Sequence, residues 1–216
     1  MTENNKMIEM AMIAQSNIES VFQMAEASTE IPTSPRKRGF LEAGTHAAYY
    51  FDSNAEKQSR IFPLCREIMD AKNAFLIYIA GKQGVKGIRL SLKDVGFDVA
   101  QYEKSKQLKI ADSEEWFLSS GRVQKFKELE DLERQLETNA REAIESGFSH
   151  VTVISETDML VRKGFLSSYK EFDRFLNSTI EQIRAAFVCA FDKRELVAAG
   201  VRDISADISR LHSQVI

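Results

Sequence analysis

The sequence predicts a three-layer α/β fold, in which a mostly parallel central sheet carries helices on both faces. Short apolar runs, typical of buried strands, alternate along the chain with longer segments whose apolar residues recur every three or four positions, as on the buried side of a helix. One run, Ala74–Ala80 (AFLIYIA), is apolar on both faces of a strand, as in the middle of a parallel sheet. Strands that alternate with helices imply right-handed crossovers, which place helices over both sides of the sheet.

Five runs predict the strands of this sheet. The first is short, apolar and aromatic, and each of the later ones follows a segment with helical spacing. All are between four and eight residues long, which is the ordinary length of a strand. In chain order the predicted strands are Ala47–Phe51, Ala74–Ala80, Leu108–Ala111, His150–Ile154 and Ala185–Phe191.

Five helical segments follow these strands or separate them. Ser53 or Asn54 can cap the first segment, and Pro63 within it predicts either a kink or a helix that starts near Phe62. A glycine lies just after the second segment and another just after the third, as expected at helix ends. In chain order the segments run from residue 53 or 54 to Ile68, from Ile88 to Val95, from Phe126 to Ile144, from Phe165 to Ile180 and from about Lys193 to Ala199.

Changes in composition divide the chain into four parts. Residues 1–28 predict an amphipathic, methionine-rich helical arm, whose wide apolar face must be buried against its own domain or against a second chain. Residues 29–39 hold two of the three prolines and predict a linker. Residues 40–200 form the α/β domain. Residues 201–216 are an amphipathic tail, which we expect to dock on the domain as a last helix.

Composition excludes several classes of function. Lys and Arg number 29 against 32 Asp and Glu, so the chain lacks the basic excess of a nucleic-acid-binding protein. No apolar run approaches the roughly 20 residues of a membrane-spanning helix, and the N-terminus lacks the basic region of a signal peptide. Cys65 and Cys189 lie far apart, with no Cys-x-x-Cys pair. We therefore expect a reduced, cytoplasmic protein that binds neither nucleic acid nor a membrane.

The turn Gly81–Gly87 (GKQGVKG) is a candidate for anion binding. Its glycines let backbone N–H groups approach a phosphate, and its lysines add positive charge at the start of a helix. It is not a Walker A loop, because neither lysine is followed by the Ser or Thr whose hydroxyl reaches magnesium. Gly81, Lys82, Gly84 and Lys86 are therefore a possible anion-binding turn, although a tight connection between strand and helix explains the same glycines.

The spacing of histidine and cysteine predicts neither hydrolysis nor metal binding. The chain has no Gly-x-Ser-x-Gly motif, and His46, His150 and His212 show no His-Glu-x-x-His or other ligand spacing. A Cys–His nucleophilic pair would have to form in space, from Cys189 with His46 or His150. Cys189 lies in an apolar strand, where a free thiol usually only packs. We expect no catalytic residues, no metal and no cofactor.

Acidic residues follow three of the predicted strands. Asp52 follows the first strand, Glu156 the fourth and Asp192 the fifth. Because the carboxyl ends of parallel strands meet at one edge of the sheet, we expect these three side chains at the same edge. There they can hold a cation or a polar ligand. Alternatively, Asp52 and Asp192, which each precede a helix, can act as helix caps.

Several short motifs resemble, in their order and spacing, those of a known family. Gly44-Thr45-His46 leads into the aromatic pair Tyr49-Tyr50, the fourth strand ends in Ser155-Glu156, and the last strand ends in Cys189-Ala190-Phe191-Asp192. Together they resemble the MEDS family, the methanogen/methylotroph, DcmR-type sensory domain, over about residues 40–200. Each motif departs from the family's pattern at one residue: Thr45 replaces an acid, Ser155 a glycine and Phe191 a tyrosine.

This resemblance implies a RecA/KaiC-like fold that has lost its phosphate-binding loop, and a sensor of small hydrocarbon-derived compounds. Residues 51–57 (FDSNAEK) would occupy the position of that loop, where Asp52 and Glu56 would repel a triphosphate and no glycine allows close approach. Glu156 would lie near the position of the Walker B acid, and we do not expect ATP hydrolysis. With the polar residues on the apolar strands, the resemblance predicts one ligand-binding pocket near the sheet edge, lined by His46, Tyr49, Tyr50, Glu156 and Cys189, and Asp192 is a further candidate ligand-binding residue.

The sequence therefore predicts a non-catalytic, cytoplasmic sensory domain that binds a small organic ligand and signals through a partner protein or a homodimer. Two alternatives stay open. One is a degenerate RecA-like nucleotide-binding protein that uses the turn Gly81–Gly87. The other is a protein-interaction scaffold that acts through the helix at residues 1–28, because methionine side chains adapt to varied partners.

Overall fold

The structure of the chain is a computed structural model, which describes residues 41–71, 73–200, 212 and 214–215. These residues fall within one unit of the chain, Gly39–Ile216. The helix predicted for residues 1–28, the linker predicted for residues 29–39 and most of the tail predicted for residues 201–216 lie outside the described residues. Among the described helices, none has both the length and the apolar composition of a membrane span.

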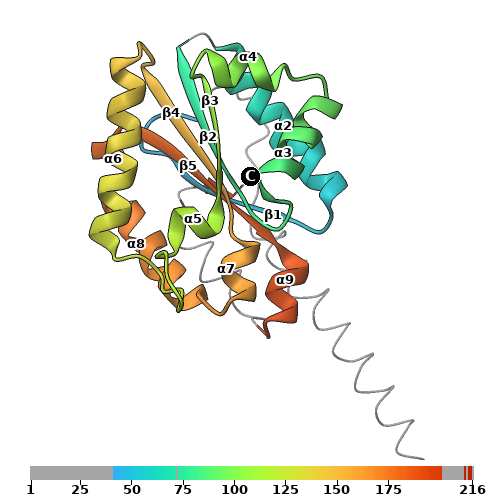
Figure 1. Ribbon diagram of the computed structural model, residues 1–216, viewed down its shortest axis with the longest axis vertical. Helices are drawn as coiled ribbons and strands as arrows, with labels where there is room; N and C mark the ends of the chain where they lie inside the picture. Colours follow the sequence, from blue (N-terminus) through green and yellow to red (C-terminus); the bar gives the residue numbers. More distant parts are fainter. Residues whose placement is uncertain (1–40, 72, 201–211, 213, 216) are drawn as a thin grey trace, which may run out of the picture. The chain divides into compact units, whose positions relative to one another are not determined.

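The described strands form a six-stranded, all-parallel sheet in the order β3-β2-β4-β5-β1-β6 (Figure 1). The mostly parallel sheet that the sequence predicts is therefore confirmed. The five predicted strands are all present, and the fourth extends two residues further, to Glu156. The strands are β1 His46–Phe51, β2 Ala74–Ala80, β3 Leu108–Asp112, β4 His150–Glu156, β5 Ala185–Asp192 and β6 Gln214–Val215.

Helices cover both faces of this sheet and complete the predicted three layers. Figure 1 shows α2, α3 and α4 on one side of the sheet and α6 and α8 on the other. Each group buries its own apolar cluster against the strands. The described helices are α2 Asn54–Asp70, α3 Gly84–Asp94, α4 Val99–Lys104, α5 Ser113–Phe117, α6 Leu129–Glu145, α7 Asp158–Arg162, α8 Leu166–Ile183 and α9 Lys193–Ala198.

The first of these helices is continuous through its proline. Ser53 caps α2, since its side-chain oxygen accepts a hydrogen bond from the N–H of Glu56 at 3.1 Å. From that cap the helix runs through Pro63 to Asp70. The alternative prediction, a helix that starts near Phe62, is therefore wrong.

Three short helices and one strand were not predicted. α4, α5 and α7 have only five or six residues, which is too short for a helical period to stand out. Two of them start at aspartates, Asp98 and Asp112, whose side chains accept backbone N–H groups. Gln214–Val215 pairs with β1 as β6, so these two residues of the tail form a strand and not the predicted last helix.

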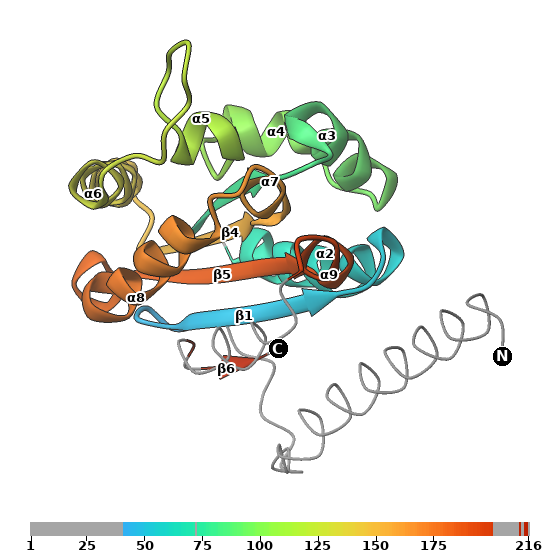
Figure 2. The same ribbon diagram turned by 90° about the horizontal axis from the view of Figure 1, so that it is seen from below.

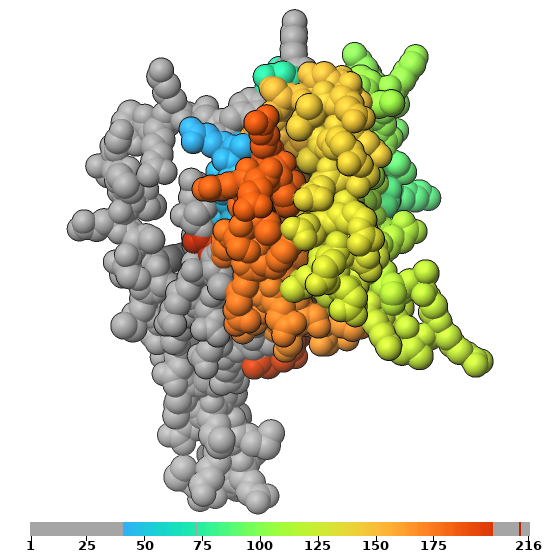
Figure 3. Space-filling view, turned by 90° about the vertical axis from the view of Figure 1, so that its left-hand side faces the viewer, coloured from blue at the N-terminus to red at the C-terminus, as the bar shows by residue number. Residues whose placement is uncertain are grey.

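Side chains on neighbouring strands alternate between the two faces in step. Ala48 of β1 is paired with Cys189 of β5, and both pack in the apolar cluster beneath α6 and α8. The next pair along the strands, Tyr49 and Ala190, packs in the cluster beneath α2. Figure 2 shows β1 and β5 side by side, and Figure 3 shows α6 and α8 covering the first of these faces. Position along a strand therefore decides which face receives a polar side chain.

The carboxyl ends of the strands meet at one edge. The parallel register pairs Phe51 with Asp192 and Glu156 with Ala190. The short helices α5, α7 and α9 follow β3, β4 and β5 and lie together along this edge (Figure 1). The prediction that Asp52, Glu156 and Asp192 emerge at the same edge is therefore confirmed.

The C-cap of α8 provides a test of backbone strain. Arg184 has φ 55° and ψ 38°, a left-handed conformation in which a side chain crowds the backbone. We expect Arg184→Gly to raise the free energy of unfolding by about 0.5–1 kcal/mol, because glycine adopts this conformation without that crowding. Urea unfolding measures the difference. Arg184→Ala, which removes the same side chain but keeps the Cβ, is the control, and an equal gain in that variant would contradict the explanation.

Candidate functional site

The residues predicted to bind a ligand do not form one site, because the sheet separates them. His46 and Cys189 lie on the face that α8 covers, where His46 Nε2 is 3.4 Å from Cys189 Sγ. Glu156 contacts Lys57 of α2 on the opposite face, and Tyr49 also packs on that face. The prediction of a single pocket is therefore wrong, because adjacent positions of a strand point to opposite faces. Two separate polar clusters take its place.

The first, here called the histidine cluster, consists of His46, Asp173, Cys189 and His212, all of them buried. His46 begins β1, Asp173 lies on the inner side of α8, Cys189 is in β5 and His212 belongs to the C-terminal segment. Asp173 Oδ1 lies 3.1 Å from His46 Nε2, 3.3 Å from His212 Nε2 and 3.4 Å from Cys189 Sγ. One carboxylate oxygen thus contacts three side chains that come from distant parts of the sequence.

Two further side chains of α8 surround this cluster. Asn177 Oδ1 lies 3.0 Å from His46 Nδ1, and the Tyr169 hydroxyl donates a hydrogen bond to Cys189 Sγ at 3.0 Å. Residues four positions apart share one side of a helix. Tyr169, Asp173 and Asn177 therefore all approach the sheet from the same side of α8, and they fix the orientation of both His46 and Cys189.

Burial and hydrogen bonds determine the charges in the histidine cluster. Burial raises the pKa of the Cys189 thiol well above its ordinary value, and the Asp173 carboxylate adds to this rise. Burial opposes the ionisation of Asp173, but its hydrogen bonds with His212 and His46 lower the pKa of that carboxyl to about 2. The structure does bring His46 and Cys189 together. Their surroundings favour the neutral thiol, however, whereas a nucleophilic cysteine needs the thiolate.

The second group, here called the lysine cluster, lies on the α2 face at the carboxyl edge and consists of Lys57, Tyr78, Gln83 and Glu156. Lys57 Nζ donates to Glu156 Oε1 at 2.9 Å and to Gln83 Oε1 at 2.5 Å. The Tyr78 hydroxyl donates to Glu156 Oε1 at 2.5 Å. The side chains of Lys57 and Glu156 are only 2% and 1% exposed. Such a buried ion pair depends on these added hydrogen bonds, because both charges have left water.

The turn Gly81–Gly87 directs its first backbone N–H groups at carboxylates of the same chain. The N–H of Gly81 donates to Glu156 Oε2 at 3.3 Å. The N–H of Lys82 lies 3.2 and 3.1 Å from the two carboxylate oxygens of Asp158. A Cβ on Gly81 would collide with Asp158 Oδ1, so a residue larger than glycine does not fit there. The predicted anion-binding turn therefore already faces two anions that the protein itself supplies.

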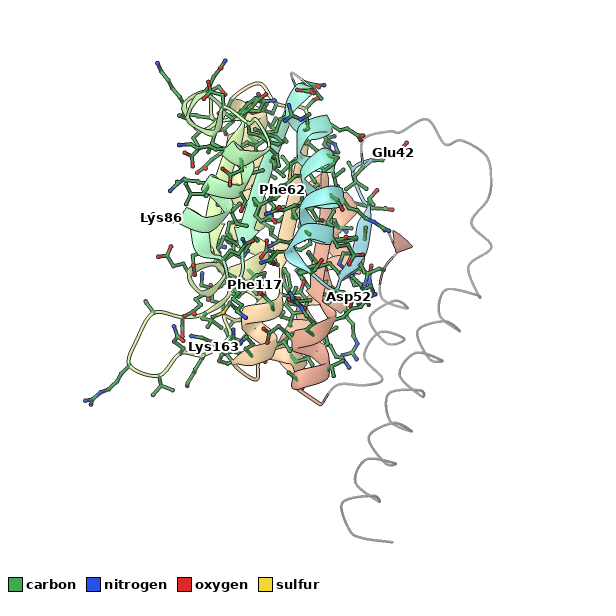
Figure 4. The ribbon with its side chains drawn as sticks, turned by 90° about the vertical axis from the view of Figure 1, so that its right-hand side faces the viewer. Glu42, Asp52, Phe62, Lys86, Phe117 and Lys163 are labelled. Atoms are coloured by element: carbon green, nitrogen blue, oxygen red, sulfur yellow. The ribbon has the colours of Figure 1, made fainter. Side chains whose placement is uncertain are left out.

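The two lysines of this turn have other surroundings. Lys82 Nζ lies 3.3 Å from Glu195 Oε1 of α9. Lys86 is exposed and points outward from α3 (Figure 4). Gly84 begins α3 with φ 64°, a conformation that favours glycine. Of the four residues predicted to bind an anion, Gly81 and Lys82 thus contribute N–H groups to internal carboxylates, and Gly84 shapes the turn.

The other two acids of the carboxyl edge have basic partners. Asp192 caps α9 by accepting a hydrogen bond from the N–H of Arg194 at 2.9 Å, and it also pairs with the Arg194 guanidinium at 2.6 Å. Asp52 pairs with Lys193 at 3.1 Å, whereas Ser53 caps α2. The interpretation as a helix cap is therefore confirmed for Asp192 and wrong for Asp52.

Tyr49 and Tyr50 lie on opposite faces of β1. The Tyr49 hydroxyl donates to the carbonyl of Glu56 at 3.4 Å, and burial, assisted by the Glu56 carboxylate, raises its pKa to about 12. Tyr50 stacks against Phe191 with ring centroids 5.3 Å apart. Tyr50 is therefore on the face of the histidine cluster, and Tyr49 is on the face of the lysine cluster.

Sequence reasoning missed the central charged residue of each cluster. Lys57 occupies a buried position of α2 one turn before Ile61, and Asp173 occupies a buried position of α8 one turn after Tyr169. A charged residue at the spacing of the apolar side of a helix is the signal that could have found both. His212 carries no such local sign, because its neighbours in the cluster come from other elements.

Asp158 provides a test of the electrostatics at the carboxyl edge. Burial, with a contribution from Glu156, raises its pKa to about 6, although the N–H groups of Lys82 and Met159 oppose the shift. A raised pKa in the folded state means that stability falls as the pH rises from about 4 to 7, by up to about 3 kcal/mol from this group. We expect Asp158→Asn to flatten that part of the pH profile, as measured by urea unfolding. An unchanged slope would contradict the assignment.

Comparison with solved structures identifies a similar fold. The chain resembles the crystal structure of a KaiC-like protein from the hyperthermophilic archaeon Pyrococcus horikoshii, with a TM-score of 0.53 and 12% sequence identity. The likeness covers 71% of this chain and 63% of the other, so this chain spans less than two thirds of that protein's length. At this identity the likeness shows the fold alone, which is a RecA/KaiC-like α/β fold. No curated protein matches the chain.

A family model extends the comparison to the sequence itself. Residues 45–212 match the model of MEDS, described as the methanogen/methylotroph, DcmR sensory domain. The matched region runs from the start of β1 to His212 and includes both polar clusters. The resemblance seen in the motifs around His46, Glu156 and Cys189 is thereby confirmed. Because the match covers well over half of its length, the chain belongs to the MEDS family of sensory domains.

Proposed function

We propose that this chain is a non-catalytic, cytoplasmic sensory domain that binds a small organic, hydrocarbon-derived ligand at the histidine cluster. The observation that carries the proposal is the cluster itself. Three polar side chains, those of His46, Asp173 and His212, are buried beside the Cys189 thiol, where apolar side chains would pack at lower cost. Asp173 Oδ2 has no hydrogen-bond partner among the described residues. Membership of a family of sensory domains supports the same role.

The connection from β1 to α2 is where the resemblance to RecA-like ATPases leads us to expect the nucleotide position, and its residues do not suit a nucleotide. Those ATPases carry a glycine-rich loop and a lysine between a strand and the helix that follows it. In this chain the connection from β1 to α2 is Asp52-Ser53, without glycine, and Lys57 in the first turn of α2 is neutralised by Glu156. A phosphate group would have to displace a buried ion pair. This argues against nucleotide binding at that position.

The alternative nucleotide site at Gly81–Gly87 meets a similar obstacle. Its first two N–H groups are engaged by Glu156 and Asp158, so a phosphate would compete with carboxylates that are held in place by the fold. The scaffold alternative depends on residues 1–28, which lie outside the described residues. No contact among the described residues favours either alternative over the histidine cluster.

A signal could leave the domain through the elements that meet at the histidine cluster. Three of its residues belong to β1, α8 and β5, whereas His212 belongs to the C-terminal segment. A ligand that contacts His212 together with the others would stabilise one placement of that segment against the sheet. Such differential binding is what shifts a conformational equilibrium. We propose that a partner protein or a second copy of the chain reads this shift.

The lysine cluster yields a prediction about stability. Lys57→Met leaves the buried Glu156 without its cation, and we expect the free energy of unfolding to fall by about 3–5 kcal/mol. Lys57→Met combined with Glu156→Gln removes both charges, and we expect the double variant to lose less than the single one. Urea unfolding of both variants checks this. Equal losses would show that packing, and not the ion pair, explains the effect.

Titration with a nucleotide tests the proposal that the domain does not bind ATP. We expect no saturable binding of Mg-ATP by the unmodified protein. Saturable binding that Lys82→Ala abolishes would instead support the turn Gly81–Gly87 as a nucleotide site and would contradict the proposal.

Ligand binding is tested by thermal unfolding with a panel of short-chain alcohols, amines and carboxylates. We expect at least one compound, present at about 100 times its Kd, to stabilise the protein by about 2.7 kcal/mol, which corresponds to a shift of several degrees. Asp173→Asn should abolish that shift. Glu156→Gln, on the opposite face of the sheet, should retain it. Loss of the shift in Glu156→Gln but not in Asp173→Asn would place the ligand at the lysine cluster and contradict the proposal.

A further inference from the structure

We propose that His46, Asp173, Cys189 and His212 bind a transition-metal ion, with zinc(II) as the ion that best suits them. This inference rests on the proposed function and deepens it, because it makes a metal ion the chemical centre of the sensing site. The spacing of these residues in the sequence predicted no metal, since none of them lies within one motif. The fold alone brings them together.

The distances between the donor atoms suit a tetrahedral ion. The two imidazole nitrogens, the Cys189 sulfur and a carboxylate oxygen of Asp173 all lie within 4.8 Å of one another. Asp173 Oδ1 is 3.1, 3.3 and 3.4 Å from the other three donors, and His46 Nε2 is 3.4 Å from Cys189 Sγ. With bonds of about 2.0–2.3 Å, tetrahedral zinc places its ligand atoms about 3.3–3.8 Å apart. The donors therefore need only small movements to surround the ion.

The chemistry of the donors selects among metals. Two imidazoles, one thiolate and one carboxylate are the ligand types that zinc uses in proteins. Calcium and magnesium prefer sites made of oxygen atoms, so the nitrogen and sulfur donors disfavour them. All four residues are buried, which excludes water from competing for the ion. Cys189 binds as the thiolate, and its proton is released to solvent when the ion enters.

The hydrogen bonds of Asp173 point to an additional positive charge. Three side chains converge on Oδ1, while Oδ2, also buried, has no hydrogen-bond partner among the described residues. A buried carboxylate oxygen without a partner is costly. A cation at the centre of the cluster would compensate the charge of this carboxylate and would explain why one oxygen faces all three other donors.

Neighbouring side chains already provide the support that metal ligands usually have. His46 binds the ion as the tautomer that carries its proton on Nδ1, where Asn177 Oδ1 lies 3.0 Å away and can accept it. The Nε2 lone pair then points at the ion and replaces the hydrogen bond from Nε2 to Asp173. The Tyr169 hydroxyl donates to Cys189 Sγ at 3.0 Å, a contact that would stabilise the thiolate. Both side chains come from α8, as Asp173 does. The outer hydrogen bonds of a metal site are therefore present beside the four donors.

The test uses the full chain, freed of metal by a chelator and then titrated with zinc(II) or cobalt(II). We expect one zinc ion per chain, and cobalt(II) should produce an absorption band of charge transfer from the thiolate. Cys189→Ser should abolish that band, and His46→Ala should weaken zinc binding more than about 100-fold. Cys65→Ser, which changes the other buried cysteine on the opposite face, is the matched control and should retain the band and the stoichiometry.

If substitutions at the four donor residues unfold the domain, a substitution at a residue that only supports a donor can still test the inference. Asn177→Ala should retain the fold by circular dichroism and weaken zinc binding by about 10–100-fold, as expected for a residue that orients a ligand. Absence of stoichiometric zinc binding, or equal binding by the unmodified protein and Cys189→Ser, would overturn the inference.

The zinc titration and the thermal unfolding with organic compounds can fail independently of each other. Zinc binding without stabilisation by any organic compound would support the metal site and contradict the proposed ligand. Stabilisation of the metal-free protein by an organic compound, without zinc binding, would support the proposed ligand and contradict the metal site.

Discussion

The constraint on which the rest of the structure depends is the burial of both faces of the sheet. No strand of the central group β2, β4, β5 and β1 has a face in water, so each polar side chain on them needs a partner inside the protein. α2 supplies Lys57 to Glu156, and α8 supplies Asp173 to His46 and Cys189. The two clusters are therefore consequences of one requirement, met separately on each face.

The two clusters differ in how completely that requirement is met. In the lysine cluster, Glu156 accepts hydrogen bonds from Lys57, Tyr78 and the N–H of Gly81 on its two oxygens. In the histidine cluster, Asp173 Oδ1 contacts His46, His212 and Cys189, whereas Asp173 Oδ2 has no hydrogen-bond partner among the described residues. The first arrangement satisfies its own charges and hydrogen bonds. The second is incomplete, which is why the proposals place a ligand and an ion there. The candidate site of this RecA/KaiC-like fold therefore lies on the face of the sheet opposite the lysine cluster.

The sequence predicted the fold more fully than the site. The five long strands were recognised because runs such as Ala74–Ala80 are apolar at every position, which only a doubly covered sheet requires. His46 and Cys189 were recognised as polar residues within such apolar runs. Their partner Asp173 was not, because the periodicity of a helix was used to find its apolar residues, and a charged residue at one of the buried positions of α8 does not belong to that set. The one-pocket prediction failed because motif order does not reveal which face of a strand a residue takes. His212 could be found only from the fold, since each of its neighbours in the cluster belongs to another element and His46, whose ring centroid lies 4.1 Å away, is 166 positions earlier (212 minus 46).

The pairing of β1 with β5 has a consequence for how the domain folds. His46 and Cys189 lie 143 positions apart in the sequence, and they meet only when the first strand is inserted beside the fifth. Closing so long a loop is slow compared with forming local helices and neighbouring strand pairs. Partly folded chains, with β2, β3 and β4 already assembled, would contain none of the histidine cluster. A ligand or ion bound at the histidine cluster would therefore bind only completely folded molecules and would slow their unfolding. The folded state that can bind the ligand is then also the state with the longest lifetime.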